Sequence, residues 1–316
     1  MTDLSWHESH GRASSKRASV IVMTFNRPIA LGRCLASLAS QSLDSRDFEV
    51  LVLDVSDEPA NGIVAGFGGR LDIVHRRAPN LGVASNRNAG AAMARGPVLV
   101  FLDDDCVASP DWLRTLVEAV ERDALTMAGC RTIHPRPDSA PAAAGQVITE
   151  AVDAFFNPPE KPARFLPGLN FAISRDRYLA LGGCDAAFGF LAAEDRDLVD
   201  RWLRSGGCLR ICPGASVIHE HRSSLRGFVR QYFNYGRGAW RYHRLRRKRR
   251  YGRMSEDLQL HLRLPTWLGG PLGRLAPTMR AKVLVLIGVW QAANLAGFCF
   301  QATVETFAPS DGDGHG

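Results

Sequence analysis

The stretch from Val98 to Asp105 constrains the fold more than any other part of the chain. It reads Val-Leu-Val-Phe-Leu and then runs straight into three aspartates. Five consecutive apolar residues, rich in β-formers, are typical of a central strand that is buried on both faces of a sheet. Carboxylates crowded at the end of such a strand repel one another, so either their pKa values rise or a cation joins them. The alternative interpretation is an acidic loop in solvent.

The type of ligand atom indicates which cation this strand end would hold. Mg²⁺ and Mn²⁺ prefer hard oxygen ligands and often carry phosphate oxygens as well. Open α/β sheets bind their ligands at the carboxyl ends of the strands. We therefore expect a divalent cation, Mg²⁺ or Mn²⁺, and a phosphate group at the end of this strand.

Short strand and helix patterns alternate around the central strand. The β-α-β order with short connections predicts a mostly parallel sheet covered by helices, an α/β fold. Proline and alanine dominate from Pro135 to Ala144, which predicts a loop or insertion. Strands are predicted at 19–24, 48–54, 71–75, 126–133 and 168–174, and helices from Pro28, at 86–95, at 110–121 after a Ser109 cap, and at 194–203.

The helix predicted at 194–203 begins with acidic residues. Its buried stripe runs from Leu198 to Leu203, and Asp195 lies three and four residues before the first two members of that stripe. Asp195 therefore points inward with them. A carboxylate in that position is either a catalytic group or a cap bonded to backbone N–H groups, and the sequence leaves both interpretations open.

Positive charge is concentrated in one segment. The formal net charge is +7, but 12 of the 39 Lys and Arg residues lie between His221 and Arg253, where there is no Asp or Glu. The rest of the chain has 27 basic and 32 acidic residues and is therefore mildly acidic. The basic segment also contains aromatic residues, which suits nucleic acid, an anionic membrane surface or a solvated helix. No recognised nucleic-acid module accompanies it, so nucleic acid is the less favoured partner.

The cysteines and the N-terminal residues indicate in which cellular compartment the protein is found. The seven cysteines are scattered and include no Cys-x-x-Cys pair, which favours a reducing cytoplasm over a disulfide framework. Residues 1–18 are polar, without the apolar core of a signal peptide, and are predicted to be a disordered leader.

The segment from Val283 to Val304 contains no charged residue over 22 positions. As a helix it would be about 33 Å long, enough to cross a bilayer core. Gln291, Asn294 and Gln301 lie close to one helical face, which favours a helix that lies in the membrane interface or packs on the protein over one surrounded by lipid. Of these, we favour the in-plane membrane helix, with a core or dimer helix as the alternative and a true span last. We therefore predict that residues 226–316 form a basic, helical, membrane-associating extension on the inner face of an anionic membrane.

With these pieces in order, the chain resembles the family 2 glycosyltransferases, which have the GT-A fold. The resemblance implies a Rossmann-like, mostly parallel sheet flanked by helices over residues 19–225, followed by the helical extension. The segments that carry it are 19–28 with 47–54, 80–90 running into 94–105, and 182–185 with 194–198 and then His219.

The resemblance also implies roles for individual residues. Asp103 and Asp105 would be the DxD pair, with Asp105 as the direct metal ligand, and His219 would approach the metal or the diphosphate. Asp195 would be the general base. Many relatives have a second acidic residue where this chain has Val55, and Asp57 is the candidate to replace it. The nucleotide and donor side would be lined by Met23, Thr24, Phe25, Asn26, Asp54, Asn80, Arg87, Asn88, Asp103 and Asp104.

The implied activity is inverting transfer of a sugar from a nucleotide-diphosphate sugar to a hydroxyl of a glycan, a lipid-linked molecule or another acceptor. One rival enzyme class uses the same residues. Asp103 to Val107 fits the D-x-D-x-V pattern of haloacid-dehalogenase-like phosphatases, in which Asp103 would be the nucleophile. Those enzymes usually carry the pattern on their first strand, whereas three predicted strands precede it here. The rival also leaves 80–90 and Asp195 unexplained.

Overall fold

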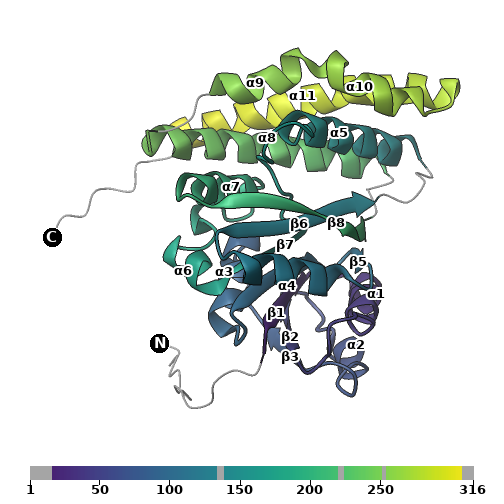
Figure 1. Cartoon of the computed structure of the whole chain (residues 1–316). Helices are drawn as coiled ribbons and strands as arrows, with labels where there is room; N and C mark the ends of the chain where they lie inside the picture. Colours follow the sequence, from purple (N-terminus) through teal and green to yellow (C-terminus); the bar gives the residue numbers. More distant parts are fainter. Residues whose placement is uncertain (1–15, 134–138, 220–223, 251–253, 308–316) are drawn as a thin grey trace.

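The computed structural model describes residues 16–133, 139–219, 224–250 and 254–307 (Figure 1). One eight-stranded sheet has the order β3-β2-β1-β4-β7-β6-β8-β5. Its strands are β1 Ala18–Thr24, β2 Phe48–Asp54, β3 Ile73–Arg77, β4 Val98–Asp103, β5 Cys106–Ala108, β6 Thr126–Ile133, β7 Asn170–Ser174 and β8 Cys208–His219. The helices are α1 Pro28–Leu38, α2 Asn61–Ala65, α3 Val83–Met93, α4 Trp112–Arg122, α5 Ala140–Phe156, α6 Arg175–Ala180, α7 Glu194–Arg204, α8 Leu225–Lys248, α9 Met254–Leu262, α10 Leu264–Gly273 and α11 Pro277–Phe307, with a 3-10 turn at Ala186–Phe188.

The sheet is parallel in its first half and mixed in its second. Strands β1 to β4 run parallel, whereas β7 is antiparallel to both β4 and β6. Strand β8 is parallel to β6, and β5 closes the edge in the antiparallel direction. The carboxyl ends of β1, β2 and β4 therefore meet at one edge. The predicted α/β fold with a GT-A sheet is confirmed.

Alternating side chains of the central strands feed two separate cores. Val20, Val50 and Val100 belong to the core that packs beneath α1, α2 and α4. Ile21, Leu51 and their neighbours pack on the opposite face, against α3, α6 and α7. All residues of β2 are buried, as expected for a strand covered on both faces. They include Glu49, whose carboxylate accepts hydrogen bonds from Ser19 and Arg95.

A layer of helices lies on top of the sheet domain and has a core of its own (Figure 1). Side chains from α5, α8, α10 and α11 build that core, which includes Phe228, Leu264 and Trp290. Helix α5 belongs to the 19–225 range, so the helices beyond residue 225 do not form this layer alone. The loop predicted from Pro135 to Ala144 is wrong for residues 140–144, which open α5. Ser139 caps that helix by accepting a hydrogen bond from Ala142 N at 3.3 Å, and proline is tolerated in a first helical turn.

Several predicted boundaries shift in the structure. The predicted leader lies outside the described residues up to 15, but it is wrong at its end, because Ala18 is fully buried in β1. Arg17 also bonds Glu121 at 2.7 Å. Ser109 is not a helix cap; its hydroxyl accepts a hydrogen bond from Ser216 N and so ties α4 to β8. The strand predicted at 71–75 is found two residues later, and the helix predicted at 86–95 begins three residues earlier.

The basic segment is not a simple solvated helix. Four of its arginines form ion pairs with carboxylates of the sheet domain and of the last helices, and these pairs join α8 to both. These ion pairs join Arg241 and Arg244 to Glu305, Arg246 to Asp200 and Asp257, and Arg249 to Asp185 and Asp197.

Helices α8 and α11 cross at very close range through glycines. A Cβ at Gly297 would lie 1.9 Å from the carbonyl oxygen of Phe233, and one at Gly236 would lie 1.9 Å from that of Asn294. Backbone atoms cannot move aside as a flexible side chain can. The crossing therefore requires glycine on both helices.

We expect Gly297→Leu to destabilise the helical layer by about 1–3 kcal/mol, because overpacking a close contact forces the helices apart. Gly288→Leu on the same helix is the matched control, because a Cβ there meets nothing within 4 Å. Both variants gain the same helix propensity, so the difference in their thermal unfolding midpoints isolates the crossing. Equal midpoints for the two variants would show that α8 and α11 are not in this contact.

Candidate active site

The three aspartates at the end of β4 face different partners. Asp104 is buried, and its Oδ2 accepts a hydrogen bond from Thr24 Oγ1 at 2.7 Å. Asp105 accepts one from Arg27 Nη1 at 2.5 Å, and the same nitrogen lies 3.2 Å from Asp104 Oδ1. Asp103 keeps 39% of its side chain exposed and can be reached by a ligand. The end of β4 therefore holds one structural carboxylate and two that remain accessible.

The guanidinium of Arg87 connects the two halves of the site. Arg87 lies on α3, and its side chain is buried. The guanidinium donates hydrogen bonds to Glu194 Oε1 at 2.8 Å and to Gly168 O at 2.7 Å. It also lies 3.7 Å from Asp103 Oδ1. The Gly168 N–H in turn donates to Asp195 Oδ2 at 2.9 Å. Asp103 and Asp195, 92 residues apart in the chain, thus share one hub made of Arg87 and Gly168.

Gly168 is required by the tightness of this hub. A Cβ there would lie 2.8 Å from Arg87 Nη2 and 3.0 Å from Asp195 Cβ. Any side chain would therefore push apart the arginine and the aspartate that the backbone joins.

The charges at the hub shift the ionisation of its carboxyls. The protein around Asp103 removes part of the hydration of its half-exposed carboxylate, which raises its pKa although the charge of Arg87 opposes the rise; the charge of Asp105 raises the pKa further. Burial also raises the pKa of Glu194, together with the charge of Asp195 and against that of Arg87. An added cation would relieve this crowding, because it favours the ionised form of each acid.

Asp195 lies in the first turn of α7, and both of its carboxylate oxygens accept hydrogen bonds from backbone N–H groups. Oδ2 accepts from Gly168 N and Oδ1 from Arg196 N, the latter at 2.8 Å. It is half-buried, whereas its neighbour Glu194 is buried. The two interpretations of Asp195 are therefore not exclusive: its capping bonds fix the orientation of a carboxylate that is still partly exposed.

Asn88 and Asp54 serve the scaffold around the site. The Asn88 amide bonds Cys184 O at 2.8 Å and Tyr178 OH at 2.7 Å, so it ties α3 to the segment after α6. Asp54 is fully buried and accepts from Ser56 N and Ala60 N. Although burial opposes ionisation, the hydrogen bonds to its carboxylate lower the pKa of Asp54 to about 2. Contact of either side chain with a nucleotide stays a prediction.

The loops after β1 and β2 are joined by a reciprocal pair. Asn26 Nδ2 donates to Asp57 Oδ2 at 2.7 Å, and Asp57 N donates to Asn26 Oδ1 at 2.9 Å. Asn26 has a φ of 55°, a left-handed conformation that asparagine tolerates. Asp57, the candidate to replace the acid missing at Val55, is therefore engaged with Asn26. Phe25 and Asn80 are exposed beside this edge, and Met23 is half-buried in β1.

His219 reaches the aspartate cluster from β8. Its Nε2 lies 3.5 Å from Asp105 Oδ1, because β8 pairs with β5 immediately after the aspartates. Across the described ranges, no three His, Cys, Asp or Glu side chains converge as a ready-made metal site. The Arg27 cation instead bridges Asp104 and Asp105.

Two site residues were missed by the sequence analysis. Arg27 precedes the helix-opening proline and reads as part of a turn, so nothing local indicates its ion pairs 77 and 78 residues away. Glu194 precedes Asp195 in the acidic first turn of α7. Both are acids, but Glu194 is buried against Arg87 whereas Asp195 is partly exposed, and the sequence does not show this difference in burial. The signal for Glu194 was present, because a first-turn acid that faces the core needs a cationic partner.

Comparison with known proteins decides between the enzyme classes. Residues 19–180 match the sequence profile described as glycosyl transferase family 2, which covers more than half of the 316 residues. The chain belongs to glycosyl transferase family 2. The haloacid-dehalogenase-like interpretation of Asp103 is therefore not supported.

Curated relatives of this family 2 enzyme match it over part of their length. The chain is 38% identical over 104 residues to validoxylamine A glucosyltransferase of Streptomyces hygroscopicus subsp. limoneus, covering 32% of this chain and 23% of the relative. It is 28% identical over 181 residues to glucosyl-dolichyl phosphate glucuronosyltransferase of Haloferax volcanii, covering 55% and 57%. The matches thus span from under a quarter to somewhat over half of these relatives.

Solved structures show the same fold at low sequence identity. The mannosyltransferase PcManGT from Pyrobaculum calidifontis, in complex with GDP-Man and Mn²⁺, superimposes with a TM-score of 0.60 at 17% identity, covering 92% of this chain and 86% of that one. GalNAc-T7 with UDP, GalNAc and Mn²⁺ gives a TM-score of 0.51 at 16% identity, covering 77% and 54%. At these identities the likeness shows the GT-A fold alone.

Proposed function

We propose that this family 2 glycosyltransferase is an inverting, metal-assisted enzyme that transfers a sugar from a nucleotide-diphosphate sugar to an acceptor hydroxyl. The observation that carries the proposal is the hub of Arg87 and Gly168, which holds Asp103 at 3.7 Å and Asp195 at 2.9 Å. A leaving-group site and a proton acceptor must lie on opposite sides of one sugar for inversion. The two solved relatives contain a nucleotide or nucleotide-sugar with Mn²⁺, which agrees with this use of the fold.

The donor set at the end of β4 fits a divalent cation. Asp103, Asp105 and His219 offer carboxylate oxygens and an imidazole nitrogen, which suit Mn²⁺ or Mg²⁺. The raised pKa of Asp103 indicates carboxylates that an added cation would stabilise in their charged form. When bound, the ion supplies neutralisation of the charge that grows on the departing diphosphate. Arg27 would give up its contact with Asp105 to admit it.

The reaction is a single displacement at the anomeric carbon of the donor sugar. The acceptor oxygen bonds to the anomeric carbon while the bond from that carbon to the diphosphate oxygen breaks. The nucleoside diphosphate leaves with the bonding electrons, and the hydroxyl proton passes to Asp195. Arg87 and Gly168 hold Asp195 in place, and the exposed Asn26 lines the donor edge, whereas the buried Thr24 acts indirectly by holding Asp104. The anomeric centre is inverted because the displacement occurs once.

A donor screen scored by released nucleoside diphosphate tests this function. The full chain would be incubated with Mn²⁺ and each of several nucleotide sugars, and with a generic phosphate ester as the alternative substrate. We expect release from at least one nucleotide sugar and none from the ester. Hydrolysis of the ester alone would overturn the proposal.

The helical layer supports a second proposal, docking of the enzyme on the inner face of an anionic membrane. Helix α11 is long and apolar enough to cross a bilayer by length and composition, and 33% of its most apolar stretch is buried. Its polar residues face the protein: Gln301 is buried and accepts from Arg237 Nε at 2.9 Å, and Gln291 contacts His261. The face left outward is apolar. Its most exposed members are Leu284, Val285, Leu295, Phe300, Val304 and Phe307.

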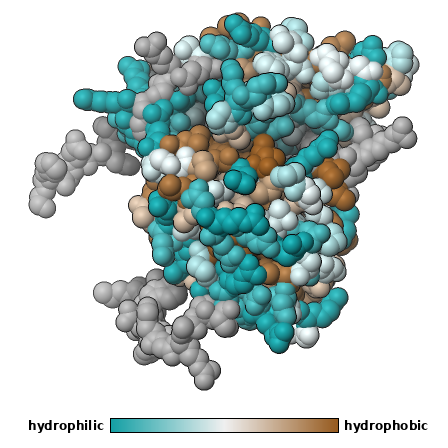
Figure 2. Space-filling view, in the orientation of Figure 1, coloured by the Kyte–Doolittle hydropathy of each residue, from teal (hydrophilic) through white to brown (hydrophobic). Residues whose placement is uncertain are grey.

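This arrangement favours a helix lying in the membrane plane. A true span would require α11 to leave its close crossing with α8, whereas an in-plane helix keeps that crossing and buries its outward face in lipid. Figure 2 shows apolar side chains also reaching the surface in a band where the helical layer meets the sheet domain. On the face that Figure 2 shows, apolar surface thus lies beside the helical layer, at its junction with the sheet domain.

Replacing Leu284, Val285 and Leu295 by glutamine is expected to abolish flotation of the full chain with anionic liposomes. Each side chain is at least 50% exposed, so the change removes a lipid contact without opening a core. Ile29, Leu179 and Ile211, exposed apolar residues of the sheet domain, changed to glutamine give the matched control, which should float as the wild type does. Wild-type protein that fails to float at low salt would refute membrane docking.

A further inference from the structure

The turn that leads into Asp195 has a backbone conformation that alanine rarely adopts. Ala193, the residue before α7, has a φ of 76° and a ψ of 13°, in the left-handed region. A residue with a Cβ is strained there, and such a conformation persists only where the surrounding structure holds it. Alanine also has no side-chain group that could cap the helix. The contacts around the first turn of α7 therefore determine where the Asp195 carboxylate lies.

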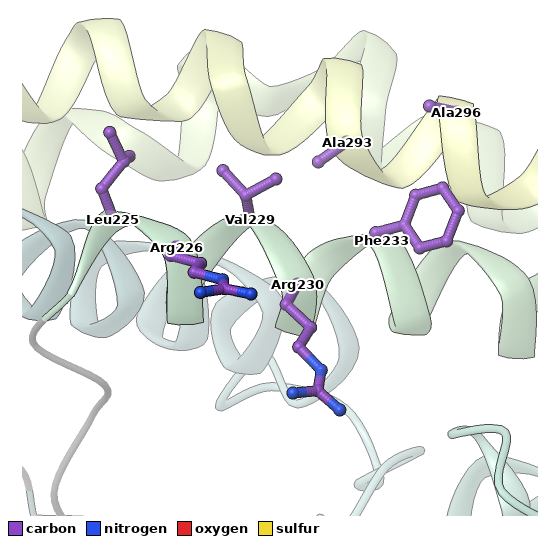
Figure 3. A pocket seen from close by; sticks show the side chains of 7 residues that line it. All are labelled: Leu225, Arg226, Val229, Arg230, Phe233, Ala293 and Ala296. Carbon is purple, nitrogen blue, oxygen red and sulfur yellow. The ribbon is translucent and has the colours of Figure 1, made fainter.

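Helix α8 is in backbone contact with this turn. Apolar side chains near the start of α8 point toward α11 and line an open groove there (Figure 3). Farther along α8, the helix faces the sheet domain, and a Cβ at Gly238 would lie 2.1 Å from the carbonyl oxygen of Ala192. Tyr242, one turn farther on, is buried in the cluster against which Ala193 packs. The helical layer thus touches the strained turn directly.

The side chain of Arg196 extends from the first turn of α7 into the helical layer. Its guanidinium donates a hydrogen bond to Asp257 Oδ1 on α9 at 2.7 Å. The guanidinium carbon lies 4.7 Å from the ring centroid of Tyr242 on α8 and 5.2 Å from that of Phe156 on α5. A carboxylate and two aromatic rings together fix the plane of a guanidinium. Three helices of the layer therefore hold the residue next to Asp195.

The carboxylate of Asp257 uses its two oxygens differently. Oδ1 accepts from Arg196, whereas Oδ2 lies 3.3 Å from His243 Nε2 and 3.7 Å from Arg246 Nη1. Burial lowers the pKa of His243 to about 4, although the charge of Asp257 opposes this, so the ring is neutral at neutral pH. The negative charge of Asp257 is thus shared by two guanidiniums. Only 14% of its side chain is exposed, so water screens these contacts little.

Arg196 also bonds the carboxylate of Asp195 through its backbone. Its N–H donates to Asp195 Oδ1 at 2.8 Å, and the N–H of Gly168 donates to Oδ2 at 2.9 Å. One oxygen is therefore held from the segment before β7, and the other by a residue whose side chain is anchored in the helical layer. A shift of the first turn of α7 would move the Arg196 N–H and turn the carboxylate away from Gly168.

We propose that Arg196 is a positioning residue for the general base Asp195, and that α8 and α9 contribute to the active site through it. The contacts of its guanidinium hold the first turn of α7 against the strain at Ala193 and thereby fix the Asp195 carboxylate. The inference rests on the proposed function, in which Asp195 accepts the proton of the acceptor hydroxyl. Misplacing a reacting group by about 1 Å can cost about 100-fold in rate, so a small relaxation of this turn is enough to affect turnover.

The first test compares Arg196→Gln with Arg204→Gln in the full chain. Both arginines lie on α7, but Arg204 is at its far end, 3.5 Å from Asp200. We expect Arg196→Gln to lower kcat about tenfold or more while nucleoside diphosphate binding stays within about twofold of the wild type. Arg204→Gln should match the wild type in both. An unchanged kcat in Arg196→Gln, or an equal loss in the two variants, would overturn the proposal.

Hydrogen–deuterium exchange reports the position of Asp195 without any turnover. The Gly168 amide is bonded to Asp195 Oδ2, so its exchange accelerates when the carboxylate moves away. We expect exchange at Gly168 to be about tenfold faster or more in Arg196→Gln, and as in the wild type in Arg204→Gln. Wild-type exchange in Arg196→Gln would refute positioning through Arg196. Because no substrate is needed, failure of the donor screen leaves this result intact.

A glycine at position 193 tests whether Arg196 acts through the strained turn. Glycine adopts a φ of 76° without strain, so the turn then needs less support. Ala193→Gly combined with Arg196→Gln should recover most of the kcat that Arg196→Gln alone loses. Arg196→Lys keeps a positive charge for Asp257 but not the planar fork, and it should lie between glutamine and the wild type. It replaces Arg196→Gln in every measurement if glutamine prevents folding. A glycine variant that recovers no activity would contradict the proposal.

Discussion

Asp105→Ala is expected to lose most transferase activity, and excess chelator should reduce the wild type to the same level. Asp105 lies at the open end of β4, 3.5 Å from His219, and presents a carboxylate that is 26% exposed. The leaving diphosphate gains charge as the glycosidic bond breaks, so loss of the cation removes its main stabilisation. The measurement is nucleoside diphosphate release at increasing Mn²⁺ or Mg²⁺, together with direct Mn²⁺ binding in the presence of nucleoside diphosphate.

Asp111→Ala is the matched control for this loss. Asp111 is an exposed carboxylate six residues farther along, where it bonds Ser42 and Arg114. It should retain wild-type turnover and metal response. Full wild-type activity in excess chelator would remove the metal from the mechanism, and Asp105 would then be an anchor for Arg27 only. Normal Mn²⁺ binding by Asp105→Ala would shift the ligand role to Asp103 and His219.

The central strand shows what sequence could predict about this protein. An apolar run that ends in carboxylates specifies burial on both faces and an active edge, because few other environments tolerate that order of residues. The predicted α/β sheet and its ligand edge follow from it, and β4 lies in the middle of the sheet as expected. The positions of β1, β2 and α1 could also be predicted, because the spacing of apolar residues along a strand or helix is a local property of the sequence.

Long-range pairing could not be predicted in the same way. Arg27 bonds aspartates more than 70 residues away, and Arg249 bonds Asp185 and Asp197 across the helical layer. Nothing in a run of arginines shows which of them have partners, because the partners come from other elements. The same limit applies to the start of α5. Its segment rich in proline and alanine is compatible with a loop or a helix, and it forms a helix because Ser139 caps it and the helical layer offers an apolar surface to pack on.

Helix α11 shows a subtler limit. Its glutamines form one stripe, and a polar stripe is normally assigned to the side that faces water. In the structure Gln301 is 4% exposed and bonds Arg237, so the stripe faces protein and the apolar side faces outward. The spacing of the stripe could be predicted from the sequence, whereas its direction depends on the polar groups that α8 and α9 present to α11.

Asp195→Asn is expected to lower turnover by about 100-fold or more while donor affinity changes little. Asparagine keeps the shape of the side chain and can still accept one of the two backbone hydrogen bonds, from Arg196 N or Gly168 N. It cannot accept the proton of the acceptor hydroxyl at the moment of attack. In the proposed mechanism the donor is held by the aspartates at the end of β4 and not by Asp195, so the loss should appear in kcat rather than in nucleotide binding.

Two companion variants separate catalysis from scaffolding at this position. Asp200→Asn removes another carboxylate from α7, one that pairs with Arg246 at 3.2 Å away from the hub, and it should keep wild-type turnover. Asp195→Glu keeps a proton acceptor on a longer stem and should recover part of the activity that asparagine loses. If Asp195→Asn instead abolished nucleotide binding, or lowered the unfolding midpoint enough to explain the lost activity, the carboxylate would be a brace for Gly168. The base would then have to be sought elsewhere, and Glu194 would be next, because burial and the Asp195 charge raise its pKa toward the range where a general base operates.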